Sequence, residues 1–396
     1  MNMNEQMKES EESILHTYNR FPVVFEKGQG CYLYDSEGKE YLDFAAGIAV
    51  NSLGYHYPGY DEALKDQIDK LMHISNLYYN EPIIEAGAKL VKASKMSKAF
   101  FTNSGTEAIE GALKAAKKYA YVRDGHADHE IIAMNHSFHG RSIGALSVTG
   151  TAHYREPFEP LMGGVKFADF NNLESVKAQI TDKTCAIITE VVQGEGGIYP
   201  AKKEFLEGLR QICDEKDIML IFDEIQCGMG RTGHYFAWQA YGVQPDIMTS
   251  AKALGCGVPV GAFVLSEKAA KASLEPGDHG TTYGGNPFVC AAVSKVFDIY
   301  ENDKIIEHVQ EMTPYLEQKL DEIVAKHECA ATRRGMGFMQ GIVIQGRPVG
   351  EVVKAALAKG LLVISAGSDV LRIVPPLVIT KELIDKMAAI LDECME

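Results

Sequence analysis

Ile218-Met219-Leu220-Ile221-Phe222, which runs directly into Asp223-Glu224-Ile225-Gln226, is the stretch that decides the fold. Five apolar residues without polar alternation are typical of a central strand that is covered on both faces. An acid then follows the strand, and in open parallel sheets ligands bind just outside the carboxyl ends of the strands. The sequence therefore places Asp223 where an acid that binds a ligand is expected.

A lone lysine follows in similar surroundings. Lys252 lies among small residues in Ser250-Ala251-Lys252-Ala253-Leu254-Gly255, after Pro245-Asp246-Ile247-Met248-Thr249. Lysine is strongly hydrated and is rarely buried without a partner, and a desolvated lysine is a candidate Schiff-base amine. Asp223 and Lys252 together indicate an acid and an amine that face one ligand.

The composition is that of an ordinary globular enzyme. The 396 residues suffice for two or three domains, and 39 Lys and Arg against 54 Asp and Glu give a formal net charge of -15. This charge argues against nucleic acid or an anionic membrane as the main partner. The eight cysteines form no C-x-x-C pair, and residues 1–13 are polar and acidic, unlike a signal peptide. We therefore expect a cytoplasmic protein without a structural zinc site or a membrane-spanning segment.

Strand-like and helix-like runs alternate through the middle of the chain, which predicts a mostly parallel sheet with helices on both sides. The expected strands are 130–134, 164–167, 185–190, 218–222 and 261–265, and the expected helices are 60–72, 82–94, 106–123, 173–180 and 203–216. A hairpin is expected within 27–44, and a continuous helical region within 287–325. The last part, 337–394, has the pattern of a smaller α/β unit.

Asn103-Ser104-Gly105-Thr106-Glu107-Ala108 precedes one of these helices. Free N–H groups and the dipole at a helix start favour an anion, and Gly105 permits close approach of the backbone, so Gly105 and Thr106 are candidates for a phosphate site. A capping box, in which a serine or threonine is followed by an acid, explains the same letters. Both interpretations stay open at this stage.

Asn135-His136-Ser137-Phe138-His139-Gly140-Arg141 follows the expected strand at 130–134. Phe138 offers a flat ring, and Arg141 offers a planar fork that suits a carboxylate. Because His126 and His129 are nearby, a metal site has to be weighed. The four histidines lack a carboxylate pattern that would complete a ligand shell, so no metal is expected.

Four further segments have a functional and a plain structural interpretation. The loop 190–197, with Glu195 among its glycines, is either a turn or part of a site. The glycines of 228–233 match G-x-G-x-x-G, but they do not follow the strand directly and open no helix, so a nicotinamide site is disfavoured. The loop 280–287, with Thr281 and Thr282, is either an anion site or a tight turn. Arg372 interrupts an apolar run and must face either solvent or a carboxylate.

These parts match the needs of pyridoxal phosphate, whose aldehyde requires a lysine, whose ring nitrogen requires an acid and whose phosphate requires backbone donors. The chain resembles the class III (ω-amino acid) aminotransferases of the fold-type I pyridoxal-phosphate family along nearly its whole length. The motifs that carry the resemblance are N-S-G-T-E-A at 103–108, S-F-H-G-R at 137–141, V-Q-G-E-G-G at 192–197, D-E-I-Q at 223–226, S-A-K-A-L-G at 250–255 and G-T-T-Y-G-G-N-P at 280–287.

The resemblance implies an α/β fold with two domains. A large cofactor-binding domain, 66–290, would hold a mostly parallel seven-stranded sheet flanked by helices. A smaller α/β domain would combine an N-terminal segment, 1–65, with residues 291–396. The family also implies a homodimer with a shared active site.

The resemblance assigns the cofactor contacts residue by residue. Lys252 would form the Schiff base and shuttle protons, and Asp223 would pair with the pyridinium nitrogen. The remaining contacts would be Gln226 to the ring hydroxyl, Phe138 against the ring face, Gly105 and Thr106 to the phosphate, and Thr282 to the phosphate from the second subunit.

Within the class, the segments 43–51, 73–82 and 137–141 are most similar to the acetylornithine aminotransferases. In that family Arg141 would bind the α-carboxylate of acetylornithine, and Arg372 that of glutamate or 2-oxoglutarate. Glu195 would mask Arg372 while the ω-amino substrate is bound, and Thr281 is a further candidate substrate contact. Cys256, where the family usually has a glycine or another small residue, is a departure that concerns loop packing.

The expected reaction is transfer of the δ-amino group of acetylornithine to 2-oxoglutarate, as in arginine biosynthesis. Aminotransferases of 4-aminobutyrate, succinylornithine or ornithine are close alternatives that would use the same lysine and acid. A nicotinamide-dependent dehydrogenase and a non-catalytic binding protein are the alternatives from other classes.

Overall fold

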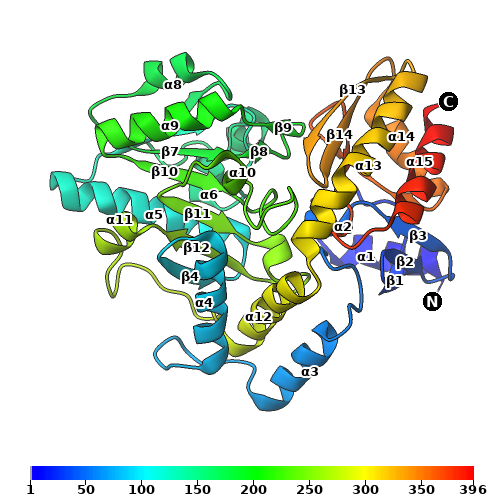
Figure 1. The fold of residues 1–396 in the computed structure, drawn as a ribbon, viewed down its shortest axis with the longest axis horizontal. Helices are drawn as coiled ribbons and strands as arrows, with labels where there is room; N and C mark the ends of the chain where they lie inside the picture. Colours follow the sequence, from blue (N-terminus) through cyan, green and yellow to red (C-terminus); the bar gives the residue numbers. More distant parts are fainter. Residues whose placement is uncertain (1) are drawn as a thin grey trace.

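A seven-stranded sheet lies at the centre of the larger body in this computed structural model, which describes residues 2–396 (Figure 1). The strand order is β4-β12-β11-β10-β7-β5-β6. Strand β12 runs antiparallel to both of its neighbours, β4 and β11. The remaining neighbours, from β11 to β6, pair in parallel. The strands are β4 Lys98–Thr102, β5 Glu130–Met134, β6 Val165–Ala168, β7 Thr184–Glu190, β10 Met219–Asp223, β11 Ile247–Ser250 and β12 Gly261–Leu265. The predicted mostly parallel sheet is confirmed.

The central strand β10 shows why the sheet needs cover on both sides. All five of its residues are buried. Met219 and Ile221 pack into one hydrophobic cluster, and Leu220 and Phe222 pack into another. Because side chains alternate across a strand, the two clusters lie on opposite faces of the sheet.

Helices supply that cover, as Figure 1 shows. Buried residues of α5 (Gly105–Asp124) belong to the cluster on one face, and those of α9 (Lys203–Lys216) and α12 (Pro287–Asn302) belong to the cluster on the other. Shorter elements connect the strands: α6 Ile143–Ser147, α7 Ala152–Arg155, η1 Glu156–Phe158, α8 Leu173–Gln179, β8 Val192–Gln193, β9 Tyr199–Pro200, α10 Trp238–Tyr241, η2 Lys252–Leu254 and α11 Glu267–Lys271.

Two four-stranded sheets form the smaller body at the right of Figure 1, with orders β1-β2-β3-β15 and β13-β14-β17-β16. Their strands are β1 Phe25–Gln29, β2 Tyr32–Asp35, β3 Glu40–Asp43, β13 Ala330–Met336, β14 Met339–Ile344, β15 Leu361–Leu362, β16 Ile364–Ala366 and β17 Val370–Ile373. The remaining helices are α1 Met3–Ser13, α2 Ala46–Ala49, α3 Tyr60–Lys70, α4 Glu81–Ser94, α13 Ile305–Lys326, α14 Val349–Ala358 and α15 Lys381–Met395. Since β15 pairs with β3, segments from both ends of the chain share one sheet. The domain boundaries themselves stay a prediction.

Several expected elements need correction. The helical region 287–325 is two helices, α12 and α13, and the chain turns between them where Lys304 adopts a left-handed φ of 52°. The run 361–365 is divided between β15 and β16, which belong to different sheets. In α3 the predicted helix is present, but Ile68 and Leu71 of its apolar stripe are 49% and 44% exposed.

The strands β4 and β11 are not among the predicted strands. Within residues 2–396, none of the helices combines the length and the hydrophobicity that a membrane crossing requires.

Candidate active site

Three polar residues lie side by side at the carboxyl edge of the large sheet. In the parallel register, Asp223 of β10 lies opposite Glu190 of β7 on one side and opposite Thr249 of β11 on the other. A cavity of about 470 Å³ opens at this edge. Its lining includes Asn103, Gly105, Thr106, Phe138, Arg141, Glu190, Asp223, Gln226 and Lys252. The fold thus brings residues from five separate loops to one cavity.

Lys252 enters this cavity from the turn that directly follows β11. Its backbone has a φ of +48°, a left-handed conformation that non-glycine residues rarely adopt. Burial lowers the pKa of its amine to about 8, and the positive charge of Arg372 adds to the effect. A lysine with this pKa is partly neutral near pH 8 and can act as a nucleophile or a base.

Asp223 is buried and is held by three hydrogen bonds. Its Oδ1 accepts from the backbone N–H of Ile225 at 3.0 Å and from the hydroxyl of Thr249 at 3.3 Å. Its Oδ2 lies 2.7 Å from Nδ1 of His139, whose ring is fully buried. His139 was quoted in the sequence motif but received no role there, because only the fold brings it to Asp223.

Glu190 is a second buried carboxyl beside Asp223. It accepts hydrogen bonds from the backbone N–H groups of Gly194 at 3.1 Å and Phe138 at 3.3 Å. Burial, and next the neighbouring charge of Asp223, raise the pKa of Glu190 well above its ordinary value. Both effects disfavour the charged form of Glu190.

The start of α5 is both a capped helix end and a cradle open to the cavity. Ser104 caps the helix by accepting from the N–H of Glu107 at 3.3 Å. Gly105 and Thr106, as its first two residues, have N–H groups without intrahelical acceptors. A Cβ at Gly105 would lie 2.9 Å from the side chain of Ile225, so a larger residue would fit only if that side chain moved. The two interpretations of this sequence are compatible.

Arg372 lies in β17 and is 3% exposed. Its Nη1 donates to Oε1 of Glu195 at 2.5 Å and to Oε1 of Gln226 at 3.1 Å, and its Nη2 donates to the carbonyl of Ser365 at 3.1 Å. Burial alone would raise the pKa of Glu195, but the guanidinium outweighs it and holds that pKa below its usual value. The arginine thus faces a carboxylate and not solvent.

The loop that carries Glu195 depends on its glycines. A Cβ at Gly194 would lie 2.5 Å from the amide nitrogen of Gln226, and one at Gly196 would lie 2.6 Å from the carbonyl of His136. Gly197 has a φ of +115°. The glycines let the loop pass close to Gln226 and bring Glu195 to Arg372.

Arg141 is in a different state from Arg372. It is exposed and forms no ion pair with any residue of the described chain, 2–396. Its guanidinium carbon lies 3.9 Å from the ring centroid of Tyr154 and 5.5 Å from that of Phe138. Arg141 lines the cavity, whereas Arg372 and Glu195 are not part of its lining, and Arg372 is connected to it through Gln226.

Thr281 and Thr282 do not line the cavity of this single chain. The hydroxyl of Thr281 accepts from the N–H of Gly284 at 3.1 Å and from the side-chain amide of Asn103 at 3.3 Å. Thr282 is exposed. Roles for either residue toward a substrate or cofactor stay predictions.

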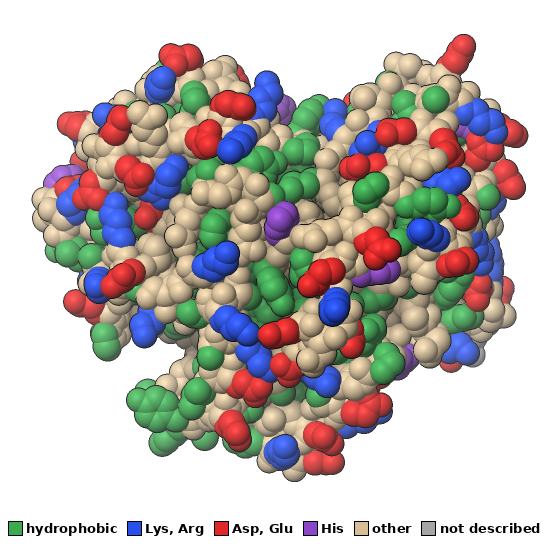
Figure 2. All heavy atoms as spheres, in the orientation of Figure 1, with side chains coloured by type: hydrophobic (Ala, Val, Ile, Leu, Met, Phe, Trp, Pro, Cys, Tyr) green, Lys and Arg blue, Asp and Glu red, His purple; other side chains and the backbone are tan. Residues whose placement is uncertain are grey.

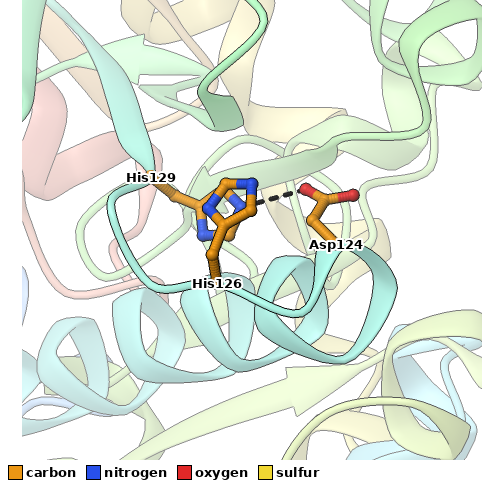
Figure 3. Close-up of side chains that lie close together, drawn as sticks. All are labelled: Asp124, His126 and His129. Atoms are coloured by element: carbon orange, nitrogen blue, oxygen red, sulfur yellow. Dashed lines mark hydrogen bonds and ion pairs between the residues drawn. The ribbon is translucent and has the colours of Figure 1, made fainter.

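The histidines do not gather in one place, and the argument that they lack a carboxylate was wrong. Asp124 lies with His126 and His129, and their potential ligand atoms are all within 4.8 Å of one another (Figure 3). The Asp124 carboxylate is already paired with Arg123 at 2.5 Å and with Nε2 of His129 at 2.9 Å. The two imidazole rings stack at 4.6 Å with an interplanar angle of 16°. Parallel rings do not direct their in-plane lone pairs at one point, and the carboxylate of Asp124 already has two partners, so this arrangement gives no support to a metal site.

The G-x-G-x-x-G loop, residues 228–233, connects the two bodies of the molecule through hydrogen bonds. Arg231, 1% exposed, donates to the carbonyls of Phe338 and Pro375, and its own carbonyl accepts from the N–H of Phe338 at 2.8 Å. No long helix begins at these glycines. The loop is structural and gives no support to a dinucleotide site.

Comparison with known proteins identifies the class of this chain. Residues 14–395 match the family described as aminotransferase class-III, so the chain belongs to that family and is an aminotransferase.

Individual relatives match nearly its whole length. An acetylornithine aminotransferase of Clostridium acetobutylicum is 47% identical over 98% of this chain and 100% of that protein, and one of Methanocaldococcus jannaschii is 48% identical over 96% and 95%. A succinylornithine transaminase of Yersinia pseudotuberculosis is 44% identical over 96% of this chain and 94% of that protein.

Solved structures share the fold. The ornithine aminotransferase of Toxoplasma gondii has a TM-score of 0.95 at 28% identity and covers 100% of this chain and 95% of its own. N-acetylornithine aminotransferase of Stenotrophomonas maltophilia has a TM-score of 0.84 at 35% identity, with 98% of each chain covered. The expected α/β fold class, with its large seven-stranded sheet, is confirmed.

The lowered pKa of Lys252 predicts unusual reactivity of its amine. Only a neutral amine is acylated, so in cofactor-free protein Lys252 should reach half its maximal reactivity near pH 8. Lys183, whose pKa is raised by its bond to Asp128, is the internal control and should react only at much higher pH. Competitive labelling with trace acetic anhydride, read peptide by peptide by mass spectrometry, measures both.

An Arg372→Met variant should move the Lys252 midpoint upward, because it removes a cation that disfavours the charged amine. If Lys252 instead titrates with the surface lysines in the parent protein, the electrostatic description of the site is wrong.

Proposed function

We propose that the protein transfers the δ-amino group of N2-acetyl-L-ornithine to 2-oxoglutarate with the help of pyridoxal phosphate. The products are N-acetyl-L-glutamate 5-semialdehyde and L-glutamate, and the reaction belongs to arginine biosynthesis in the cytoplasm. When bound, the cofactor supplies an aldehyde that accepts the amino group and a ring that stabilises negative charge at the reacting carbon.

The residues that line the cavity fit this cofactor. The open N–H groups of Gly105 and Thr106 at the start of α5 suit its phosphate, and the buried carboxylate of Asp223 suits its ring nitrogen. Phe138 would cover the ring, Gln226 would reach its hydroxyl, and the amine of Lys252 would bind its aldehyde. In one solved structure of the Toxoplasma gondii relative, PLP partially occupies the active site of that protein.

The chain's own residues would control the protons of the reaction. Lys252, with a pKa of about 8, can take a proton from the carbon that bears the amino group and return it at the aldehyde carbon. Asp223 would keep the ring nitrogen protonated, and the His139 bond at 2.7 Å fixes its orientation. The raised pKa of Glu190 disfavours a second negative charge at this edge.

The contrast between two arginines is the observation that carries the proposal for the substrates. Arg372 is buried and paired with Glu195, whereas Arg141 is exposed without an ion pair among residues 2–396. Arg141 can bind the α-carboxylate of a long substrate, so that its distal amine reaches Lys252. Arg372 can bind the α-carboxylate of 2-oxoglutarate or glutamate once Glu195 moves aside. One cavity would thus accept two unlike substrates in turn.

The choice of acetylornithine rests on the relatives. Six relatives named acetylornithine aminotransferase match at 44–48% identity, and two named succinylornithine transaminase match at 44%. The succinylated donor differs only in its acyl group, so it is the second candidate. Ornithine and 4-aminobutyrate remain less favoured donors, because neither carries an acylated α-amine.

A homodimer would complete the site. The segment between α3 and α4 carries Leu77, Tyr78 and Tyr79 with exposed fractions of 86%, 65% and 95%. In Figure 2 hydrophobic side chains gather on the projection at the lower left, where this segment lies in Figure 1. Exposed apolar patches of this kind mark protein interfaces, and a second copy would also bring the exposed Thr282 toward a cofactor phosphate.

A panel of amino donors tests the substrate assignment. The cofactor-loaded protein is mixed with acetylornithine, succinylornithine, ornithine or 4-aminobutyrate, and the loss of the cofactor's visible absorbance band is followed. We expect acetylornithine to react with the highest specificity constant and succinylornithine to follow. A preference for 4-aminobutyrate, which has no α-carboxylate beside an acyl amide, would exclude the assignment.

Replacing Glu195 by glutamine should separate the two half-reactions. Arg372 then stays charged and unmasked when the ω-amino donor binds, and an unpaired buried charge is costly. We expect the KM for acetylornithine to rise about tenfold, which corresponds to ~1.4 kcal/mol, while that for 2-oxoglutarate does not rise. Glu204→Gln, on α9, is the control. Equal changes for both substrates would contradict the masking role.

The dimer can be tested by sedimentation. We expect a particle of twice the 43.5 kDa chain mass, and Tyr79→Asp should dissociate it because the partner surface would have to bury a charge. Val122→Asp, at a 54% exposed site on α5, is the matched control and should remain dimeric. If the parent protein sediments as a monomer, the proposed role of Thr282 in binding the cofactor phosphate is wrong.

A further inference from the structure

Arg141 depends on aromatic rings for its position. Within the described residues its guanidinium has no carboxylate partner, and its near neighbours are the rings of Tyr154 at 3.9 Å and Phe138 at 5.5 Å. A cation above an aromatic face is attracted by the ring's negative face. The shorter distance makes Tyr154 the main contact.

A guanidinium carbon 3.9 Å from a ring centroid is close enough for the ring to cover the flat face of the group. A guanidinium is planar, and its N–H donors point outward in that plane. A ring that covers the flat face therefore restricts the side chain without using its donors. The donor fork remains available for a bidentate bond to a carboxylate.

Tyr154 is itself held in place by the chain around it. It belongs to α7, and its ring meets Phe138 edge-on at 6.0 Å with an interplanar angle of 82°. Just before α7, the N–H of Gly150 donates to the carbonyl of Ser137 at 3.0 Å, and a Cβ at Gly150 would lie 2.0 Å from the carbonyl of Met134. The segment that carries Tyr154 is thus fastened to the loop that carries Phe138 and Arg141.

Tyr154 also contributes to a cavity whose lining contains acids. A second cavity of about 770 Å³ is lined by Tyr154 together with Asp169, Glu195 and Asp369. These carboxylates would attract an unrestrained guanidinium. Without the ring, Arg141 would have both the freedom and an electrostatic reason to turn away from the substrate.

We propose that Tyr154 is a positioning residue that selects the amino donor, by holding the guanidinium of Arg141 flat so that its fork meets the donor's α-carboxylate. The inference rests on the proposed function, in which Arg141 binds that carboxylate. Tyr154 does not line the cavity that contains Lys252, so it acts through Arg141 and not on the reacting atoms.

The two half-reactions measure this role in the dimeric, cofactor-loaded enzyme. Tyr154→Leu should raise the apparent Kd for acetylornithine about tenfold, which corresponds to ~1.4 kcal/mol, with the maximal rate changed less than about twofold. Tyr154→Phe keeps the ring and should stay within about threefold of the parent. Glutamate, which binds at Arg372, should react with both variants at a rate within about twofold of its rate with the parent enzyme.

A donor analogue without the α-carboxylate, N-acetyl-1,4-diaminobutane, separates positioning from general damage. It cannot use Arg141, so Tyr154→Leu should not weaken its reaction. If the analogue or glutamate loses as much as acetylornithine, or if Tyr154→Phe falls as far as Tyr154→Leu, the positioning role is overturned. Tyr154→Met is the second variant should the leucine substitution prevent folding.

Arg141→Leu distinguishes failure of this inference from failure of the proposed function. If Arg141→Leu leaves the acetylornithine reaction intact, the donor is not bound as proposed, and the role of Tyr154 falls with it. If Arg141→Leu impairs that reaction while Tyr154→Leu does not, the proposed function stands and the inference about Tyr154 is wrong.

Discussion

The parallel register of β7, β10 and β11 is the constraint on which the site depends. It places Glu190, Asp223 and Thr249 at one level, and the chain leaving β11 delivers Lys252 to the same edge two residues after that strand. If the pairing register of β10 shifted by one residue, the side chain of Asp223 would point to the opposite, hydrophobic face of the sheet. The apolar residues of β10 therefore fix the position of the acid. The core that stabilises the fold therefore also aligns the chemistry.

Electrostatic coupling joins this edge to the smaller body. Arg372 of β17 lowers the pKa of Lys252, and Glu195 opposes it. Movement of Glu195 away from Arg372 would therefore change both the affinity for a second carboxylate and the basicity of the lysine. At the other side, Tyr154 restrains Arg141 without neutralising it. The two arginines therefore differ in their partners, because Arg372 is paired with Glu195 and Arg141 lies against aromatic rings.

Much of this arrangement could be predicted from sequence, because it depends on local patterns. The buried run 218–222 predicts β10 and the acid at its end, and the strand and helix alternation predicts the sheet. The partnerships of His139 and Tyr154 could not be predicted, because they join segments that approach only in the folded chain. Asp124, by contrast, lies two residues before His126, so its place beside the histidines could have been predicted from the sequence. Spacing identifies candidate residues, and the register decides which of them meet.

The most direct test of the central claim, that Lys252 and Asp223 act at opposite ends of one cofactor, is to fix that cofactor chemically. The protein is loaded with pyridoxal phosphate, reduced with borohydride, digested and mapped by mass spectrometry. We expect one modified peptide from the parent protein, carrying the phosphopyridoxyl group on Lys252. We expect the Asp223→Ala protein to fail to retain the cofactor at stoichiometric loading and therefore to give no modified peptide. Modification of a different lysine, or none in the parent protein, would contradict the account.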